Sequence, residues 1–95
     1  MREYEMIVII SPEVAEEDVP STIDKVSDFI TSRGGEVTEV DRWGKRKLAY
    51  PIKHFIEGNY VLTRFKFEPG MTAELEARLK ISEMILRHMV VRLGD

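Results

Sequence analysis

Residues 42–66, RWGKRKLAYPIKHFIEGNYVLTRFK, contain the clearest strand pattern of the chain. Over residues 58–68, the odd-numbered side chains share one face of an extended chain, and these are Val61, Thr63, Phe65 and Phe67. The other face carries Tyr60, Leu62, Arg64 and Lys66. One face is therefore apolar enough to join a core, and the other carries both apolar and charged side chains. Residues 36–43 predict the preceding strand, with a bulge or bend near Gly44, a continuation over residues 48–50 and an end to regular pairing at Pro51.

Residues 42–66 also concentrate the positive charge of a weakly acidic chain, and we call them the basic segment. The chain has 95 residues and a formal net charge of −3. The basic segment has seven Lys and Arg against Glu57 alone, whereas residues 1–41 have three basic and eleven acidic residues. It also holds the only Trp and two of the three Tyr. Positive charge gathered at one place predicts an anionic partner there.

Outward from the basic segment, two helices are predicted. The first lies near residues 16–33, begins within residues 16–19 because Pro20 suits only a first turn, and ends at Gly34-Gly35. Its apolar stripe consists of Val19, Ile23, Val26 and Ile30. The second lies over residues 71–82, with Met71, Leu75 and Leu79 in one row. We expect both apolar rows to pack against the face that carries Val61, Phe65 and Phe67.

Two further strands complete a β-α-β-β-α-β order. Residues 2–10 predict an interior strand and residues 84–93 the last strand. This order predicts the α+β, ferredoxin-like class: a four-stranded antiparallel sheet with two helices on one face. The other face is then free for a partner. We expect residues 1–95 to form one domain of this kind.

Few residue sets in this sequence could carry chemistry. The chain has no Cys, its two His residues (His54 and His88) lack partners at metal-ligand spacing, and no nucleophile-elbow, P-loop or dinucleotide motif is present. We therefore expect no enzyme, no cofactor, no metal site and no small-molecule substrate. The longest apolar run, residues 6–10, is too short to span a membrane, and the acidic N-terminus is unlike a signal peptide. A cytoplasmic location without membrane contact is expected.

Two other families share this order of elements and fit less well. A small acylphosphatase has a phosphate-binding Arg after the first strand, but residues 11–18, SPEVAEED, are acidic. An RNA-recognition motif has aromatic residues at set positions of its central strands, and the spacing of Tyr4 and Tyr60 does not match. Base stacking is therefore not expected as the main binding mode.

The basic residues have two readings. Lys45, Arg46, Lys47 and Lys53 could be solvated side chains that protect an edge strand, or phosphate contacts that displace counterions. Trp43, Tyr50 and Tyr60 among them favour an interface, where large aromatic residues are common. Alternation along a strand predicts that Lys45 and Lys47 point to one side and Arg46 to the other, unless the bend at Gly44 breaks the alternation.

The run DRWGKRKLAYPI at residues 41–52, followed by GNYVLTRF, resembles the signature of the bacterial small-subunit ribosomal protein S six (S6) family. The first strand, MREYEMIVII, and the run RHMVVR at residues 87–92 are similar to that family's first and last strands. The resemblance covers essentially the whole chain and implies a structural, non-enzymatic constituent of the small ribosomal subunit. Some members carry a charged C-terminal extension, and contacts made by such an extension are not expected from residues 1–95.

The resemblance also implies partners: the central domain of 16S ribosomal RNA and the small basic neighbour, ribosomal protein S eighteen (S18). On matching positions it implies RNA contact by six residues, which are Arg2, Lys45, Arg46, Lys47, Lys53 and Arg87. We expect the protein interface to include four residues, which are Trp43, Tyr50, Tyr60 and Leu62. The alternative is a free-standing regulatory or ligand-binding domain of the same fold. Such a sensor would need a Gly-rich loop after the first strand, and residues 11–17 contain no Gly.

Overall fold

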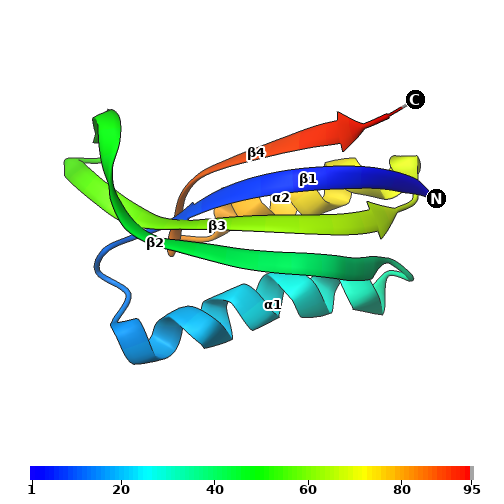
Figure 1. The fold of residues 1–95 in the computed structure, drawn as a ribbon, viewed down its shortest axis with the longest axis horizontal. Coiled ribbons are helices and arrows are strands. Elements are labelled where there is room, and N and C mark those ends of the chain that lie inside the picture. The colour runs from blue at the N-terminus through cyan, green and yellow to red at the C-terminus, as the bar shows by residue number, and fades with distance from the viewer. Residues whose placement is uncertain (95) are drawn as a thin grey trace.

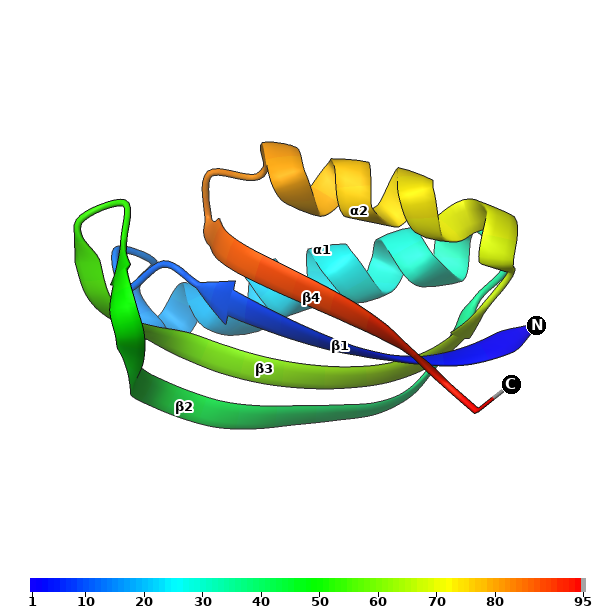
Figure 2. The same cartoon turned by 90° about the horizontal axis from the view of Figure 1, so that it is seen from above.

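The computed structural model describes residues 1–94, and its elements follow the predicted order (Figure 1). The strands are β1 (Arg2–Ile10), β2 (Glu36–Ile52), β3 (Phe55–Phe67) and β4 (Ile85–Leu93), and the helices are α1 (Val19–Ser32) and α2 (Thr72–Ile81). The strands pair antiparallel in the order β2-β3-β1-β4. Both helices lie on one side of the sheet (Figure 2). The predicted α+β architecture is therefore observed.

The second strand is longer than the sequence predicts. Instead of two pieces it runs for 17 residues, and its pairing with β3 changes register three times: between Val37 and Glu39, between Arg42 and Gly44, and across residues 48–51. The second change is the bend predicted near Gly44, whose φ of +83° is a conformation that suits glycine. The third confirms that regular pairing fails around Pro51.

The main core lies between the helices and the sheet, as predicted. From the predicted helix stripes, four residues are buried, which are Val19, Ile30, Leu75 and Leu79, and Ile23, Val26 and Met71 pack against them in part. Val61, Phe65 and Phe67 of β3 meet them, together with Tyr4, Met6, Val8 and Ile10 of β1. Thr22 and Phe29 of α1 are buried too, although they stand outside the predicted stripe.

The ends of α1 follow from local chemistry. Pro20 occupies the first turn, where its missing N–H is not needed, and a single 3-10 turn, Glu16–Asp18, leads into it. At the other end Gly34 has a φ of +85°, and the N–H groups of Gly34 and Gly35 donate to the carbonyl oxygens of Thr31 and Ile30 at 3.1 and 2.9 Å. This pair of bonds closes the helix as the two glycines predict. No helix within residues 1–94 is long and apolar enough to cross a membrane.

Candidate nucleic-acid interface

The basic segment forms the outer part of the β2–β3 hairpin, which projects beyond the end of β1 and bends toward β4 (Figure 1). Ile52 pairs with Phe55, so only Lys53 and His54 form the turn. Their φ angles are +50° and +75°, as in the type I′ turns that Asn-Gly favours. Lys53 and His54 therefore have positive φ angles, which are unfavourable for residues other than glycine. Both side chains are exposed at the end of the hairpin.

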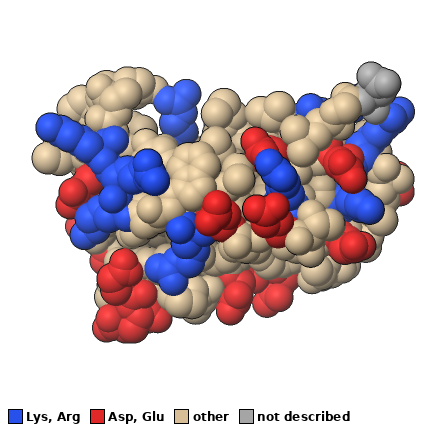
Figure 3. Space-filling view, viewed as in Figure 1, with Lys and Arg blue, Asp and Glu red and all other residues tan. Residues whose placement is uncertain are grey.

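The lysines of the hairpin are little engaged by the rest of the protein. Lys45 lies 3.9 Å from the Glu57 carboxylate with both side chains about half exposed, and such a surface pair contributes little. Among residues 1–94, no carboxylate oxygen lies within 4.0 Å of the Lys47 or Lys53 amine. Figure 3 shows Lys and Arg gathered over this end of the molecule, beside an acidic group at the start of α1. The hairpin thus presents positive charge on an acidic protein.

The register places the three consecutive basic residues on two sides of the hairpin. Lys45 pairs with Asn59, Arg46 with Gly58 and Lys47 with Glu57, without a register change between them. Alternation therefore holds beyond the bend at Gly44. Lys45 and Lys47 share one side and Arg46 takes the other, as the sequence predicts.

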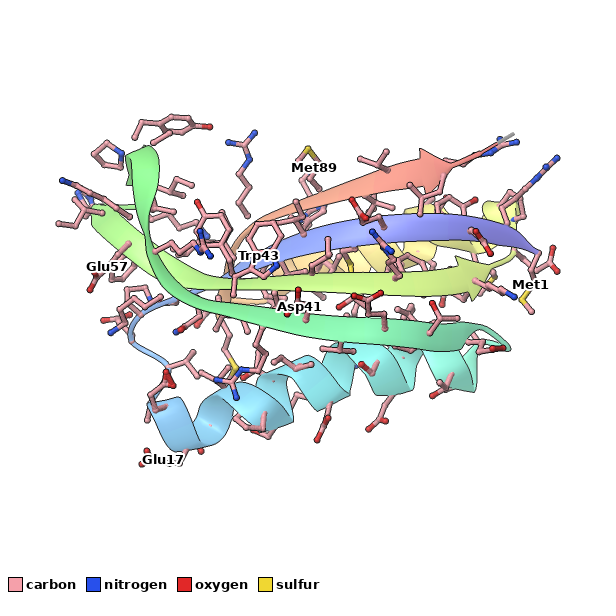
Figure 4. The ribbon with its side chains drawn as sticks, viewed as in Figure 1. Met1, Glu17, Asp41, Trp43, Glu57 and Met89 are labelled. Carbon is pink, nitrogen blue, oxygen red and sulfur yellow. The ribbon has the colours of Figure 1, made fainter. Side chains whose placement is uncertain are left out.

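Arg46 points into an aromatic stack on the face of the sheet opposite the helices, which we call the open face. Its guanidinium lies 5.4 Å from the centre of the Trp43 ring, and that ring is stacked on Tyr60 with 6.2 Å between centroids. The Trp43 Nε1–H donates to Asp41 at 3.2 Å, and Figure 4 shows Trp43 in front of the sheet near Asp41. A guanidinium held on an aromatic ring loses less freedom on binding than an unsupported side chain. Trp43 and Tyr60, predicted to contact a protein, thus also support a basic residue.

Arg87 and Tyr50 contact each other across the end of the sheet. Arg87 of β4 was expected to bind RNA and Tyr50 of β2 to bind protein. The Arg87 Nη1–H donates to the Tyr50 hydroxyl, and the guanidinium carbon lies 5.8 Å from the centre of the Tyr50 ring. The structure therefore brings Arg87 to the hairpin by a contact that the sequence does not reveal.

A second apolar cluster packs the outer part of this hairpin against β1 and β4. Ile9, Leu48 and Leu86 are buried together, with Ile52, Phe55 and Tyr60 packed around them. Gly58 makes the close approach possible, because a Cβ atom there would lie 2.6 Å from Ile9 Cγ2. Glycine within a strand often marks such an approach, so Gly58 was a signal in the sequence. The cluster fixes where the basic segment leaves the sheet.

Two predicted site residues do not belong to this surface. Arg2 lies at the start of β1, opposite Phe67, and so at the other end of the sheet from the hairpin. Leu62 lies on the open face as predicted, but only 8% of it is exposed in the free protein, so its place in a protein interface stays a prediction.

The open face has exposed apolar residues that the sequence reasoning missed. Met89 and Val91 of β4 are 49% and 46% exposed, and Ile7 and Tyr60 beside them are half-buried. Figure 4 shows Met89 above Trp43 on this face. Alternate residues of a strand share a face, so positions 87, 89 and 91 of the last strand were the available signal. Together Ile7, Trp43, Tyr60, Met89 and Val91 form what we call the open-face patch.

Residues 1–94 contain no group of three or more His, Cys, Asp or Glu side chains placed to hold a metal ion. His54 lies in the hairpin turn, and His88 lies 3.7 Å from Glu76 as a single pair. The fold and this surface define a class: a small α+β binding domain with a basic hairpin and an apolar sheet face.

Comparison with known proteins gives the family. A sequence model described as Ribosomal protein S6 matches residues 3–92. The small ribosomal subunit protein bS6 of Desulforamulus reducens is 48% identical over 95 residues, which is all of both chains. That of Heliobacterium modesticaldum is 48% identical over 92 residues, 97% of this chain and 96% of the relative. A crystal structure of 30S ribosomal protein S6 from Thermotoga maritima has a TM-score of 0.90 and 36% identity, over 96% of this chain and 86% of that one. The chain belongs to the ribosomal protein S6 family.

Membership confirms several predictions. The resemblance read from residues 41–52 is correct, and the ferredoxin-like fold is shared with a solved member at high similarity. The chain is a protein of the small ribosomal subunit, located on the ribosome in the cytoplasm. It is a structural protein and not an enzyme, because its relatives are named as ribosomal proteins of the small subunit.

Proposed function

We propose that this chain binds the central domain of 16S ribosomal RNA through its basic segment, jointly with ribosomal protein S18. The observation that carries the proposal is the pair of unengaged amines, Lys47 and Lys53, at the end of a projecting hairpin on a chain of net charge −3. Each Lys or Arg that neutralises a phosphate releases a counterion, which supplies most of the sequence-independent affinity for nucleic acid. Phosphate contacts of this kind position a protein on RNA without reading its sequence.

Four of the predicted RNA contacts lie on the hairpin, with Lys45 and Lys47 on one side, Arg46 on the other and Lys53 in the turn. They lie on adjoining parts of a single hairpin, with Arg46 held on Trp43. Arg2 stands apart at the other end of β1, so it would contact a different part of the RNA. Two separated contacts on a protein whose longest extent is 36 Å suit a folded RNA better than one short helix.

A basic neighbour would complete the binding surface. Outside the basic segment the chain is acidic, and an acidic protein is repelled by RNA beyond the hairpin. The open-face patch offers an apolar area for S18, since an exposed cluster of this type marks an interaction site. Trp43 and Tyr60 would then belong to both surfaces, so that binding of S18 would fix the stack that carries Arg46.

The test is cooperative binding to a fragment of the 16S central domain. We expect the RNA to bind this chain weakly alone and more tightly when S18 is present, with a coupling free energy of ~1–3 kcal/mol. Val91→Lys, on the open-face patch, is expected to reduce the coupling. Val40→Lys, at a similarly exposed residue of β2 outside the patch, is the control and is expected to leave it unchanged. Equal RNA affinity with and without S18 would contradict the proposal.

A further inference from the structure

We propose that Tyr50 and Arg87 form a latch that holds the outer hairpin against β4, and that Arg87 is a positioning residue and not a phosphate contact. The latch itself is a property of the free protein. The effect of the latch on RNA affinity rests on the RNA binding proposed above. The latch and its effect on affinity have separate tests.

Regular pairing with β3 alone does not hold the outer hairpin. We call residues 48–56 the hairpin tip. Between the pairs Lys47–Glu57 and Ile52–Phe55, β2 has four residues where β3 has only Ile56. The regular ladder is therefore interrupted over residues 48–51, and Pro51 has no N–H to donate. A tip joined to the sheet in this way can swing about Lys47 unless something beyond β3 holds it.

Two contacts lead from the tip to other strands. Leu48, Ile52 and Phe55 pack around Ile9 and Leu86, which holds one side of the tip from Leu48 to the pair beside the turn. Between Leu48 and Ile52, Tyr50 is 55% exposed, so burial does not fix its ring. Its position is set by Arg87, which donates a hydrogen bond to the hydroxyl and places its guanidinium carbon 5.8 Å from the ring centre. Within residues 1–94, this is the side-chain hydrogen bond found between the tip and another strand.

The latch determines where Lys53 is presented. Lys53 lies in the tip, three residues from Tyr50, whereas Lys45 and Lys47 precede the tip and are held by regular pairing with β3. If the tip is held, the Lys53 amine is presented in one arrangement before RNA arrives, and less ordering is needed on binding. Loss of the latch would weaken binding without removing a charge from the hairpin.

The first test needs no RNA. Backbone relaxation by NMR measures the order parameters of residues 48–56 in the wild type and in Tyr50→Phe, Arg87→Lys and Arg87→Gln. Tyr50→Phe removes the hydroxyl but keeps the ring. We expect order parameters in the tip to fall from ~0.85 toward ~0.6 in all three variants. Arg92→Lys and Arg92→Gln, on the same strand at a residue without a contact to the tip, are the matched controls and are expected to leave the tip ordered. Unchanged order parameters in Arg87→Gln and Tyr50→Phe would overturn the latch.

The second test separates positioning from phosphate contact. Affinity for the 16S fragment is measured with S18 present over a series of salt concentrations. The latch predicts that Tyr50→Phe and Arg87→Lys both bind about two- to tenfold more weakly, the range for one lost hydrogen bond, with the slope of log affinity against log salt unchanged. Direct phosphate contact predicts the reverse: near-normal binding by Arg87→Lys, and a slope smaller by ~0.7–0.9 in Arg87→Gln. That second pattern would overturn the positioning role. If the wild type binds no RNA, the RNA proposal fails and the NMR result still decides the latch.

Discussion

Replacing Gly58 with alanine would measure how closely the basic segment packs on the end of β1. The new Cβ atom would lie 2.6 Å from Ile9 Cγ2, 3.1 Å from the Ile10 carbonyl oxygen and 3.7 Å from Leu86 Cδ1. The first distance is well below a normal contact. Ile9 is only 7% exposed, and the carbonyl belongs to a paired strand, so neither can move far. The hairpin itself must shift outward, which opens the cluster of Ile9, Leu48 and Leu86.

The magnitude follows from two opposing effects. Forcing an extra methyl group into a packed site costs ~1–3 kcal/mol. Alanine also restricts the unfolded chain relative to glycine, which stabilises the folded state by ~0.4–1 kcal/mol where the backbone conformation is compatible. Gly58 does not have a positive φ, so no backbone strain is added. We therefore expect Gly58→Ala to lower the free energy of unfolding by about 1.3 kcal/mol, the difference between the midpoints of these two ranges.

Urea denaturation monitored by circular dichroism measures this change for a chain of this size. The matched control is Gly70→Ala, because no atom lies within 4 Å of the Cβ position there and Gly70 also lacks a positive φ. We expect the control to be as stable as the wild type or slightly more stable. If Gly58→Ala is no less stable than the control, the hairpin does not pack on β1 as described.

Three further changes test other parts of the fold. Leu79→Ala should lower the unfolding free energy by ~2–5 kcal/mol in urea, because Leu79 is buried between α2 and the sheet, and a loss near zero would contradict that placement. Leu62→Asp should lower the unfolding free energy by ~2 kcal/mol or more in the same assay, since it places a carboxylate at a buried site. A variant as stable as the wild type would show that water reaches position 62. Replacing Lys53-His54 by Asn-Gly should stabilise the protein by ~1 kcal/mol and raise its thermal midpoint, because both positions have a positive φ that Asn-Gly tolerates better. The same variant should bind RNA more weakly, because it lacks the Lys53 charge. An unchanged or lower thermal midpoint would mean that the turn carries no strain.

The order of elements and the main core could be predicted because their signals are local. Alternation at Val61, Phe65 and Phe67 and the helical spacing of Val19 and Ile30 each depend on a few neighbouring residues. The Gly44 bend was equally local, since it rests on one glycine and a change of parity around it. These features therefore appear in the structure where the sequence placed them.

The geometry of the candidate site could not be predicted, because it depends on contacts between distant parts of the chain. The meeting of Tyr50 and Arg87 joins residues 37 positions apart, and no periodicity records it. Burial of Leu62 likewise depends on what the neighbouring strands place on the same face. The resemblance implied RNA contact by Arg2 without saying where Arg2 lies, and the antiparallel pairing of β1 with β3 places it at the far end of the sheet from the hairpin.

The most direct test of the RNA-binding account removes two charges from the hairpin and measures the salt dependence of binding. Lys45→Gln with Lys47→Gln takes two amines from one side of β2, and Lys25→Gln with Lys80→Gln takes two from the exposed surfaces of α1 and α2. Both variants carry the same net charge. With S18 present, the hairpin variant should bind the 16S fragment with a slope of log affinity against log salt smaller by ~1–2, and the helix variant should keep the slope of the wild type. An unchanged slope in the hairpin variant would mean that Lys45 and Lys47 are only solvated, and would contradict phosphate contact by this side of the basic segment.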